Sequence, residues 1–427
     1  MKKTLVAIAA LAATGAFAQS SISIYGNLDQ GVYRQTDSGQ TYSKIASNVN
    51  STSTLGFRGT EDLGGGMRGG FHLLSELSLP EGQVGSSTSG DAATAGGQKP
   101  NFFTRAANVY IEGNDTGHFE IGRIQDVVWQ TQGAFNNTGS NSFGFGAYTA
   151  SQTNFSSLID QRMGSMPSDT VYQNTTTGQV GATSGSTNTQ NCVTTAATAA
   201  TPNCFGSANN SQSGSAPINF NAGWGYTTPT YYGVKATYQH VGNAFQYGPK
   251  VTGAAGASIA ATTGNAYRLE YTNGPLNVQW AQTSRQDGND ALGAKWVVIG
   301  ATYQMGAAKL VGAQSKLTTS NGFSAIDGNT VTGFGVIYDV NATVDVGAGY
   351  TTLKDNSSTG AAAGQSAKLL GLTARYKFTK RTQLYAGYAH QSQDSAMRVT
   401  PFYGGPGFSA TAGAGVTGYL VGLRHSF

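Results

Sequence analysis

Side chains that commonly carry catalysis or bind metals are few and widely separated in this chain of 427 residues. No G-x-S-x-G or H-E-x-x-H motif is present. Glu61 and Asp62 form a carboxylate pair, but the glycines that follow them favour a solvated hairpin over an acid–base site. The sequence predicts no enzyme, no metal and no cofactor, with a β-barrel hydrolase kept as an alternative. The five histidines are scattered: His72, His118, His240, His390 and His425.

The only two cysteines, Cys192 and Cys204, lie in a low-complexity segment, residues 163–216, rich in Thr, Ser, Gly, Asn and Ala. An exported chain meets an oxidising compartment, so a disulfide between them is expected. A metal site is the alternative, although the segment contains no histidine and two thiolates alone make a poor zinc site.

Charged side chains therefore remain as the candidate functional residues, and they could attract ions and select between anions and cations. Only 11% of residues are charged, and the formal net charge is +4, which is weak for a nucleic-acid binder. Sixty glycines and a mean hydropathy of −0.24 argue against a bundle of transmembrane helices. The many aromatic residues argue against a disordered polymer. This composition is typical of a large β-protein that is secreted or inserted in an outer membrane.

The first residues resemble a signal for export. Lys2 and Lys3 precede an apolar stretch, and Ala16-Phe17-Ala18 forms a small-x-small cleavage site. We expect residues 1–18 to be removed, leaving residues 19–427 as one domain. No run of 18 apolar residues follows, so membrane insertion would require strands closed into a barrel.

The elements that must position the charges are predicted to be strands, because apolar and polar residues alternate in short segments. Tyr267, Leu269 and Tyr271, for example, share one face, while Arg268 and Glu270 share the other. Seven short turns contain Gly, Asn, Asp or Pro and alternate with eight long polar loops, which predicts sixteen antiparallel strands. The loops cover residues 35–52, 79–101, 125–216, 241–264, 284–294, 317–329, 354–366 and 392–415.

Short turns on one rim and long loops on the other indicate a transmembrane barrel whose rims face different compartments. A soluble sandwich or a secreted adhesin is the alternative, but neither requires such a segregation of loop lengths. Aromatic residues near the strand ends are expected to form interfacial girdles. They are Tyr110, Phe119, Tyr238, Tyr303, Tyr338, Tyr350, Tyr376, Tyr385, Tyr419 and Phe427.

The alternation also sorts the charges, because a charge is costly toward lipid and is expected in a wet lumen. Six cationic side chains against three acidic ones predict a weak preference for anions. The inward cations are Arg58, Lys235, Arg268, Arg375, Lys377 and Arg424, and the inward acids are Asp29, Glu270 and Asp345.

Four segments resemble the general diffusion porins of Gram-negative bacteria, in particular the β-proteobacterial type. They are residues 21–26, residues 55–66, Ile121-Gly122-Arg123 and residues 421–427. The resemblance implies a homotrimer of sixteen-stranded barrels in the outer membrane, with the third loop folded into each lumen as a constriction. It also implies contact with outer-membrane lipid and lipopolysaccharide, recognition of Phe427 by the barrel assembly machinery, and passive diffusion of small ions and hydrophilic solutes.

The same resemblance assigns the constriction to residues 125–161, between the fifth and sixth strands. Asp126 corresponds to an acidic residue of this loop, and Arg123 matches an arginine of the opposing wall. Arg162 is a candidate for a second wall arginine, while Thr54 stands where the family has another. We therefore expect Arg123 to contribute most to the anion preference.

Overall fold

The computed structural model describes residues 21–80, 82–84, 102–148, 172–173, 180–181, 219–241, 263–286, 293–320, 328–356, 364–397 and 411–427. Cys192, Cys204, Arg162 and the predicted leader at 1–18 lie outside these residues, so their predicted roles stay predictions. Among the residues described, no helix has the length and hydropathy to cross a membrane.

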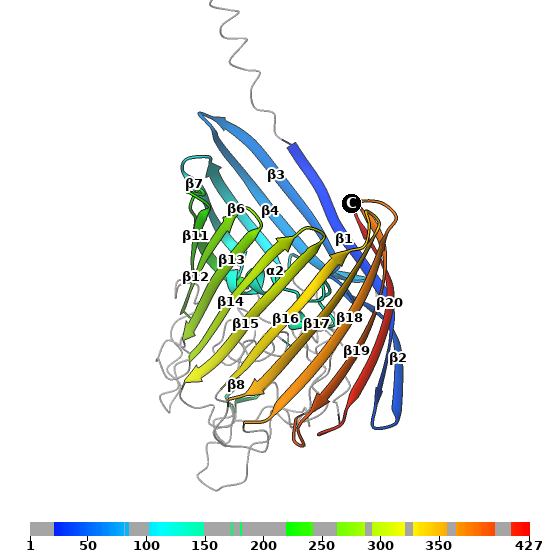
Figure 1. Ribbon diagram of the computed structural model, residues 1–427. Coiled ribbons are helices and arrows are strands. Elements are labelled where there is room, and N and C mark those ends of the chain that lie inside the picture. The colour runs from blue at the N-terminus through cyan, green and yellow to red at the C-terminus, as the bar shows by residue number, and fades with distance from the viewer. Residues whose placement is uncertain are drawn as a thin grey trace, which may run out of the picture.

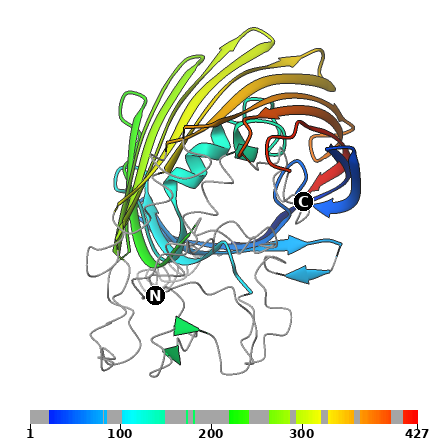
Figure 2. The same ribbon diagram turned by 90° about the horizontal axis from the view of Figure 1, so that it is seen from below.

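Sixteen antiparallel strands form one closed barrel (Figures 1 and 2). The first strand closes the barrel, because it pairs with both the last strand and the next one. Its pairing with the last strand runs from the Asn27/Ser426 pair to the Asp37/Val416 pair. Its pairing with the next barrel strand runs from the Ser21/Thr60 pair to the Asn27/Thr54 pair. The barrel strands are β1 (Ser21–Asp37), β3 (Thr54–Gly64), β4 (Met67–Ser78), β6 (Ala106–Gly113), β7 (Gly117–Gln125), β10 (Asn219–Thr227), β11 (Val234–Val241), β12 (Thr263–Asn273), β13 (Leu276–Gln286), β14 (Gly293–Met305), β15 (Ala308–Ser320), β16 (Gly328–Asp339), β17 (Val344–Asp355), β18 (Ser366–Lys377), β19 (Thr382–Gln393) and β20 (Val416–Ser426).

The predicted number of barrel strands is confirmed, as is the position of the sixth, predicted at residues 218–226 and observed as β10. The seven short connections all lie at one rim, together with Phe427, whose backbone N–H donates to the Gly26 carbonyl at 3.1 Å. The long connections lie at the opposite rim. We call these ends the turn rim and the loop rim.

Additional short strands belong to the loops and not to the barrel. β2 (Gln40–Ser47) pairs with the second half of β1, so the first loop, predicted as irregular from residue 35, begins as a hairpin. β5 (Gln83–Val84) pairs with the end of β4, and β8 (Tyr172–Gln173) pairs with β9 (Val180–Gly181). The alternation in β2 is too weak to distinguish a strand from a polar loop by sequence.

Each barrel strand presents one face outward and one to the lumen, as the alternation predicts. On β18, Leu370 and Leu372 are exposed outward, while Leu369 and Thr373 are buried inside. The outward row is apolar because it faces hydrocarbon in a membrane. The inward row contains apolar residues wherever a segment of the chain covers it.

The aromatic residues near strand ends follow this division only in part. Several lie on the outer face and are strongly exposed, as a girdle requires: Phe119, Tyr303, Tyr338, Tyr350, Tyr376 and Tyr419. Tyr110 and Tyr385 instead point into the lumen, where the Tyr110 hydroxyl lies 2.8 Å from Thr60 Oγ1 and Tyr385 donates to Asp29. Position along a strand therefore predicts a girdle less well than position and parity together.

Candidate functional site: the narrowed lumen

A helix and the segment that follows it lie inside the barrel, against the wall formed by β12 to β19 (Figure 2). The helix, α2 (Val127–Ala134), begins at Asp126, whose Oδ1 accepts a hydrogen bond from the Val128 N–H at 2.8 Å. Capping by a carboxylate satisfies a backbone donor that the helix leaves unpaired. Thr283 Oγ1 on β13 donates to the same oxygen at 2.7 Å, so the start of the helix is tied to the barrel wall.

The segment after α2 is held by hydrogen bonds to three strands of the wall. Asn137 Nδ2 donates to the Phe334 carbonyl at 2.9 Å and to Thr351 Oγ1 at 3.1 Å. Thr373 Oγ1 donates to the Thr138 carbonyl at 2.6 Å. Because Asn137 and Thr138 are fully buried, these bonds fix the segment without competition from water.

Glycines on the inner face allow the segment to approach the wall closely. A Cβ at Gly335 would lie under 3.0 Å from the Asn137 carbonyl oxygen, and a Cβ at Gly347 equally close to the Thr138 carbonyl. Any side chain at these two positions would therefore push the segment toward the axis of the lumen. The high glycine content of the chain is consistent with this close contact, but composition alone does not say which glycines make it.

An apolar core fills the space between the segment and the wall. Phe135, Phe143, Phe145 and Tyr148 are fully buried and belong to one cluster with inward residues of the strands, such as Leu369. Burial raises the pKa of the Tyr148 hydroxyl well above its ordinary value, so this group stays neutral at physiological pH. Residues 126–148 are therefore a rigid part of the barrel interior; we call them the inner loop.

A second contact joins the inner loop to the turn of the first long loop that lies next to β1. The Asn141 N–H donates to the Asn50 carbonyl at 3.0 Å, and Ser142 Oγ donates to the Val49 carbonyl. The buried Asp29 carboxylate on β1 holds this turn by accepting from the Val49, Asn50 and Ser51 N–H groups at 3.0–3.1 Å. Asp29 points inward as predicted, but it organises a turn and does not face water.

One group of lumen charges lies where β17 and β18 meet the inner loop. Asp345, only 2% exposed, forms an ion pair with Arg375 and another with Lys377 Nζ at 2.8 Å. Arg375 Nη1 also donates to the Gly139 carbonyl at 2.6 Å. Parity and the pairing register agree on the lumen face of all three residues, and the single negative charge of Asp345 is shared between two cations.

A second group lies on β11 and β12, next to the helix. Glu270 contacts Lys235 Nζ at 2.7 Å and Arg268 Nε at 2.8 Å, and Arg268 Nη1 donates to Gln130 Oε1 of α2 at 2.9 Å. Again two cations share one carboxylate. The wall of the lumen thus carries two compact groups, each made of one carboxylate between two cations.

Two predicted cations of the lumen form no ion pair with any residue in the described part of the chain. Arg58 on β3 pairs in register with Ser23 on the inner face of β1 and is exposed to the lumen. Arg424 on β20 donates from Nε to Asn27 Oδ1, a neutral partner, at 2.7 Å. Among the predicted site residues that the structure describes, Arg58 is therefore the exposed inward cation without an ion-pair partner.

The structure corrects the expectation for Arg123. Its partner in register, Ala107, lies on the same face as Val109 and Ile121, which are 58% and 50% exposed outward. Arg123 therefore starts from the outer face of β7, and its Nε donates to the Thr104 carbonyl at 2.6 Å. The family motif identifies this arginine, but the pairing register decides its face.

Asp126 is fully buried as the helix cap, so its carboxylate bonds the Val128 N–H and Thr283 and does not line the open lumen. Sequence reasoning missed Arg105, which is 5% exposed and contacts Glu76 Oε2 with Nη2 at 2.7 Å and with Nε at 3.0 Å. Arg105 precedes β6, at the end of a loop, so no alternation marks it.

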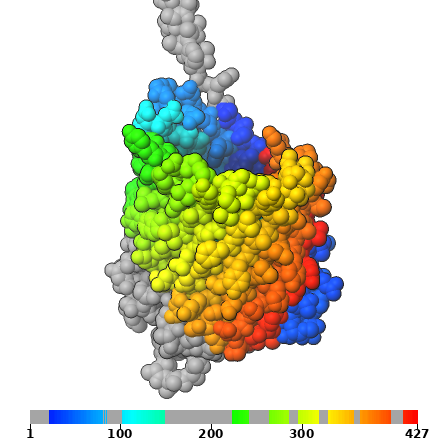
Figure 3. Space-filling model, in the orientation of Figure 1, coloured from blue at the N-terminus to red at the C-terminus, as the bar shows by residue number. Residues whose placement is uncertain are grey.

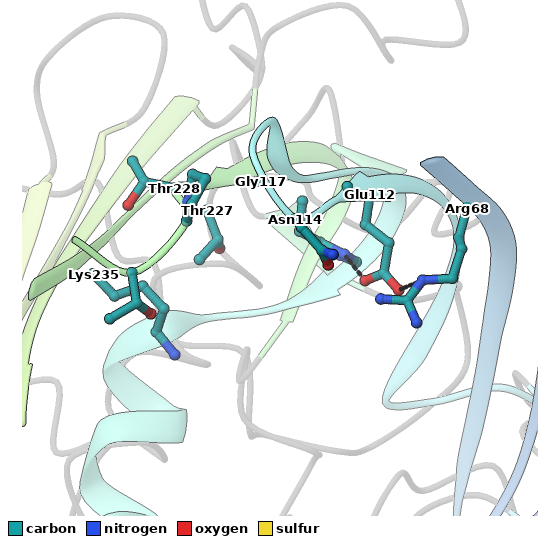
Figure 4. A pocket seen from close by; sticks show the side chains of 11 residues that line it. Arg68, Glu112, Asn114, Gly117, Thr227, Thr228 and Lys235 are labelled. Atoms are coloured by element: carbon teal, nitrogen blue, oxygen red, sulfur yellow. Dashed lines mark hydrogen bonds and ion pairs between the residues drawn. The ribbon is translucent and has the colours of Figure 1, made fainter. Parts of the chain in front are cut away.

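A shallow hollow of about 240 Å³ lies at the turn rim, between β4, β6, β7 and β11 (Figure 4). Arg68 and Glu112 point toward each other with Nε and Oε1 3.3 Å apart, and His118 Nδ1 lies 3.1 Å from Glu112 Oε2. The basic side chains that line the hollow already have acidic partners. The hollow therefore extends the polar lining of the lumen toward the turn rim. The described residues contain no cluster of metal-ligating side chains.

Comparisons with known proteins agree with this geometry. Residues 4–396 match the family model described as Gram-negative porin. The chain is 29% identical to outer membrane porin protein 32 of Delftia acidovorans over the full length of both. It is also 31% identical to an outer membrane porin protein of Bordetella pertussis, over 34% of this chain and 38% of that protein.

Solved structures show the same fold at low sequence identity. The anion-selective porin from Comamonas acidovorans superposes with a TM-score of 0.60 at 22% identity, over 96% of this chain and all of that one. OmpT of Vibrio cholerae gives 0.55 at 12% identity, over 96% and 98%. A closed sixteen-stranded barrel with an inner loop, and a family match over most of the sequence, lead to one conclusion: this chain belongs to the Gram-negative porin family of outer-membrane proteins.

Proposed function

We propose that the barrel is a water-filled channel for passive diffusion of ions and small hydrophilic solutes, with a weak preference for anions. The inner loop carries this proposal, because it is hydrogen-bonded to β13, β16, β17 and β18 and to the first long loop, and so narrows the lumen. A passage of constant width selects solutes by size and charge without a catalytic step. The family and the fold likewise point to a channel and not to an enzyme.

The charge arrangement supports a weak anion preference. Arg58 and Arg424 lack ion-pair partners among the described residues, while Asp345 and Glu270 each face two cations. An excess of fixed positive charge raises the local anion concentration and lowers that of cations. The predicted loss of Lys2 and Lys3 would reduce the chain's formal charge of +4, so the excess is small. The anion selectivity named for the Comamonas acidovorans porin agrees with this sign.

The reversal potential in a planar bilayer tests the proposal directly. Under a gradient of dilute KCl, the purified protein should form open channels whose potential has the sign of anion preference. The potential should shrink in concentrated salt, because the field reaches about 10 Å at 0.1 M and about 3 Å at 1 M. A cation-selective channel would contradict the charge assignment, and absence of conductance would contradict the channel itself.

The remaining family properties are proposed on the same basis. The assembled protein is a homotrimer that resists SDS before heating, and its turn rim faces the periplasm. Residues 1–18 direct export, and Phe427, which is 38% exposed at the turn rim, is the residue that the assembly machinery recognises. Outer-membrane lipid and lipopolysaccharide surround the barrel. Gel electrophoresis of heated and unheated samples tests the trimer. An SDS-resistant trimer band that disappears on heating is expected for this protein and is not expected for a secreted adhesin.

A further inference from the structure

Two tyrosine rings lie flat against the lumen face of β3 and β4. Tyr25 starts from β1 and its ring lies over Gly56 of β3, because a Cβ at Gly56 would lie under 3.0 Å from atoms of that ring. Tyr110 starts from β6 and its ring lies in the same way over Gly70 of β4. Both tyrosines are half-buried. Each of them therefore rests one face of its ring on the wall and turns the other to the lumen.

Neighbouring side chains hold the two rings in these orientations. The Tyr25 hydroxyl is hydrogen-bonded to His72 Nε2 on β4, and the two rings are stacked with their centroids 6.1 Å apart. The Tyr110 hydroxyl lies 2.8 Å from Thr60 Oγ1, and the Tyr110 ring packs against His118 with centroids 5.1 Å apart. We call Tyr25, His72, Tyr110 and His118 the ring strip.

Arg58 lies between the two tyrosines of the ring strip. It pairs in register with His72, so these two residues form one row across β3 and β4. Tyr25 starts two positions loopward of that row and Tyr110 two positions turnward, which is about 7 Å along the strands in each direction. The exposed guanidinium, which has no ion-pair partner among the described residues, thus has an aromatic face on either side.

The inner loop lies against the opposite wall, so the ring strip borders the passage that remains open. The helix α2 contacts β12, β13 and β14, and the segment after it bonds β16, β17 and β18. Seen along the barrel, the helix and the strands β3 and β4 lie on opposite sides of the lumen (Figure 2). At the turn rim, β3 and β4 also rise beyond the wall formed by β14 to β17 (Figure 3). A solute that passes the inner loop therefore has the ring strip beside it.

The acidic side chains of the strip lie on the turn-rim side of Arg58 and have partners of their own. Glu112 Oε2 lies 3.1 Å from His118 Nδ1, and Glu120 accepts a hydrogen bond from Asn108 Nδ2 at 3.1 Å. An anionic group is therefore favoured at Arg58 and disfavoured at the turn-rim end of the strip. The rings supply the remaining contact surface.

We propose that the ring strip is a transient binding site for planar aromatic carboxylates as they pass through the channel. The proposal rests on the channel function proposed above and names a class of solute for it. A guanidinium binds a carboxylate through two parallel N–H···O bonds, which Arg58 can form without breaking an ion pair to a described residue. The aromatic body of the solute then stacks in an offset arrangement on the open faces of Tyr25 and Tyr110.

Other anions use only part of this site. An aliphatic carboxylate or an inorganic anion is attracted to Arg58 by its charge, but neither has a π-system that stacks on tyrosine. Aromatic pairs contribute beyond their buried area by an amount that corresponds to about two- to tenfold in affinity. The ring strip should therefore distinguish an aromatic from an aliphatic carboxylate of equal charge and similar size by about this factor.

The test compares benzoate with cyclohexanecarboxylate, which has the same charge and a six-membered ring without a π-system. Currents through the purified full chain are recorded in a planar bilayer in dilute KCl at neutral pH, while either acid is added. The quantity measured is the concentration that gives half of the maximal reduction in current. For the wild type this concentration should be about two- to tenfold lower for benzoate.

Substitutions separate the contributions of charge and ring. Arg58→Gln should raise the half-maximal concentration of both acids. The variant Tyr25→Leu, Tyr110→Leu should give equal concentrations for the two acids, whereas Tyr25→Phe, Tyr110→Phe keeps both rings and should keep the difference. Tyr303→Leu removes a ring from the outer face and should leave the difference unchanged.

Equal concentrations for the two acids in the wild type would overturn the proposal. So would a difference that persists in the double leucine variant, or one that is lost in the double phenylalanine variant. Absence of KCl conductance from the wild type would instead contradict the channel itself, whereas normal conductance without discrimination between the acids would contradict the ring strip alone.

Discussion

At the scale of single residues, the face on which a cation lies and the partner it finds decide its effect on ion passage. Replacing Arg58 by Gln removes an exposed, inward charge that has no acidic partner among the described residues. We expect the reversal potential in dilute KCl to fall toward zero. Arg123→Ala serves as the control, because its side chain starts from the outer face. A larger shift for Arg123→Ala than for Arg58→Gln would contradict the assignment of both faces.

Asp345→Asn should act in the opposite direction. The carboxylate faces both Arg375 and Lys377, so its neutralisation leaves Arg375 without an ion-pair partner among the described residues and Lys377 with Asp339 alone, at 3.5 Å. The anion preference should increase, with a larger change in dilute than in concentrated salt. Asp115→Asn changes the same charge in the exposed turn between β6 and β7, and should alter the potential much less. An unchanged potential for Asp345→Asn would show that this carboxylate does not act on the passage.

At the scale of elements, the contact between the inner loop and the wall determines the width of the channel. Gly347→Val places a side chain where the Thr138 carbonyl lies, and overpacking of this kind typically costs about 1–3 kcal/mol. We expect the loop to shift and single-channel conductance to change. Gly312→Val is the control, since a Cβ there meets only the Phe334 ring at 3.3 Å on the outer face. Equal conductance of the two variants would mean that the loop does not set the width.

Asn137→Ala should loosen the same contact without adding volume. Its side chain bonds the Phe334 carbonyl and Thr351 Oγ1, and its Oδ1 accepts from the Phe145 N–H at 2.9 Å. Leaving such buried groups unpaired costs roughly 1–3 kcal/mol each. We expect stronger open-channel current fluctuations than in the exposed turn variant Asn114→Ala. Quiet channels in both variants would show that other contacts hold the loop.

At the scale of the whole molecule, the barrel should be stable without the predicted disulfide. Cys192 and Cys204 would close a short ring within a long loop, so their stabilisation, at most about 3 kcal/mol, would stay local. Replacing both by Ser should leave the SDS-resistant trimer and its melting temperature unchanged. Loss of the trimer band in unheated samples would show instead that this loop takes part in assembly.

The sequence by itself determined the number of barrel strands, the two kinds of rim and the face of most lumen charges. The alternation of apolar and polar residues and the residue types of the turns are local properties of the sequence. In a closed barrel each outward residue faces lipid, so the alternation also tells which face is the lumen. Arg375 and Asp345 could therefore be placed inside from parity alone.

The tertiary structure decided what those inward residues do. The inner loop contacts strands roughly 200 positions later in the sequence, so the burial of Leu369, the proximity of Thr138 to Gly347 and the pairing of Asp345 with two cations have no local signal. The face of Arg123 likewise depends on its pairing with Ala107, because a one-residue change of register moves a side chain to the other side of the sheet.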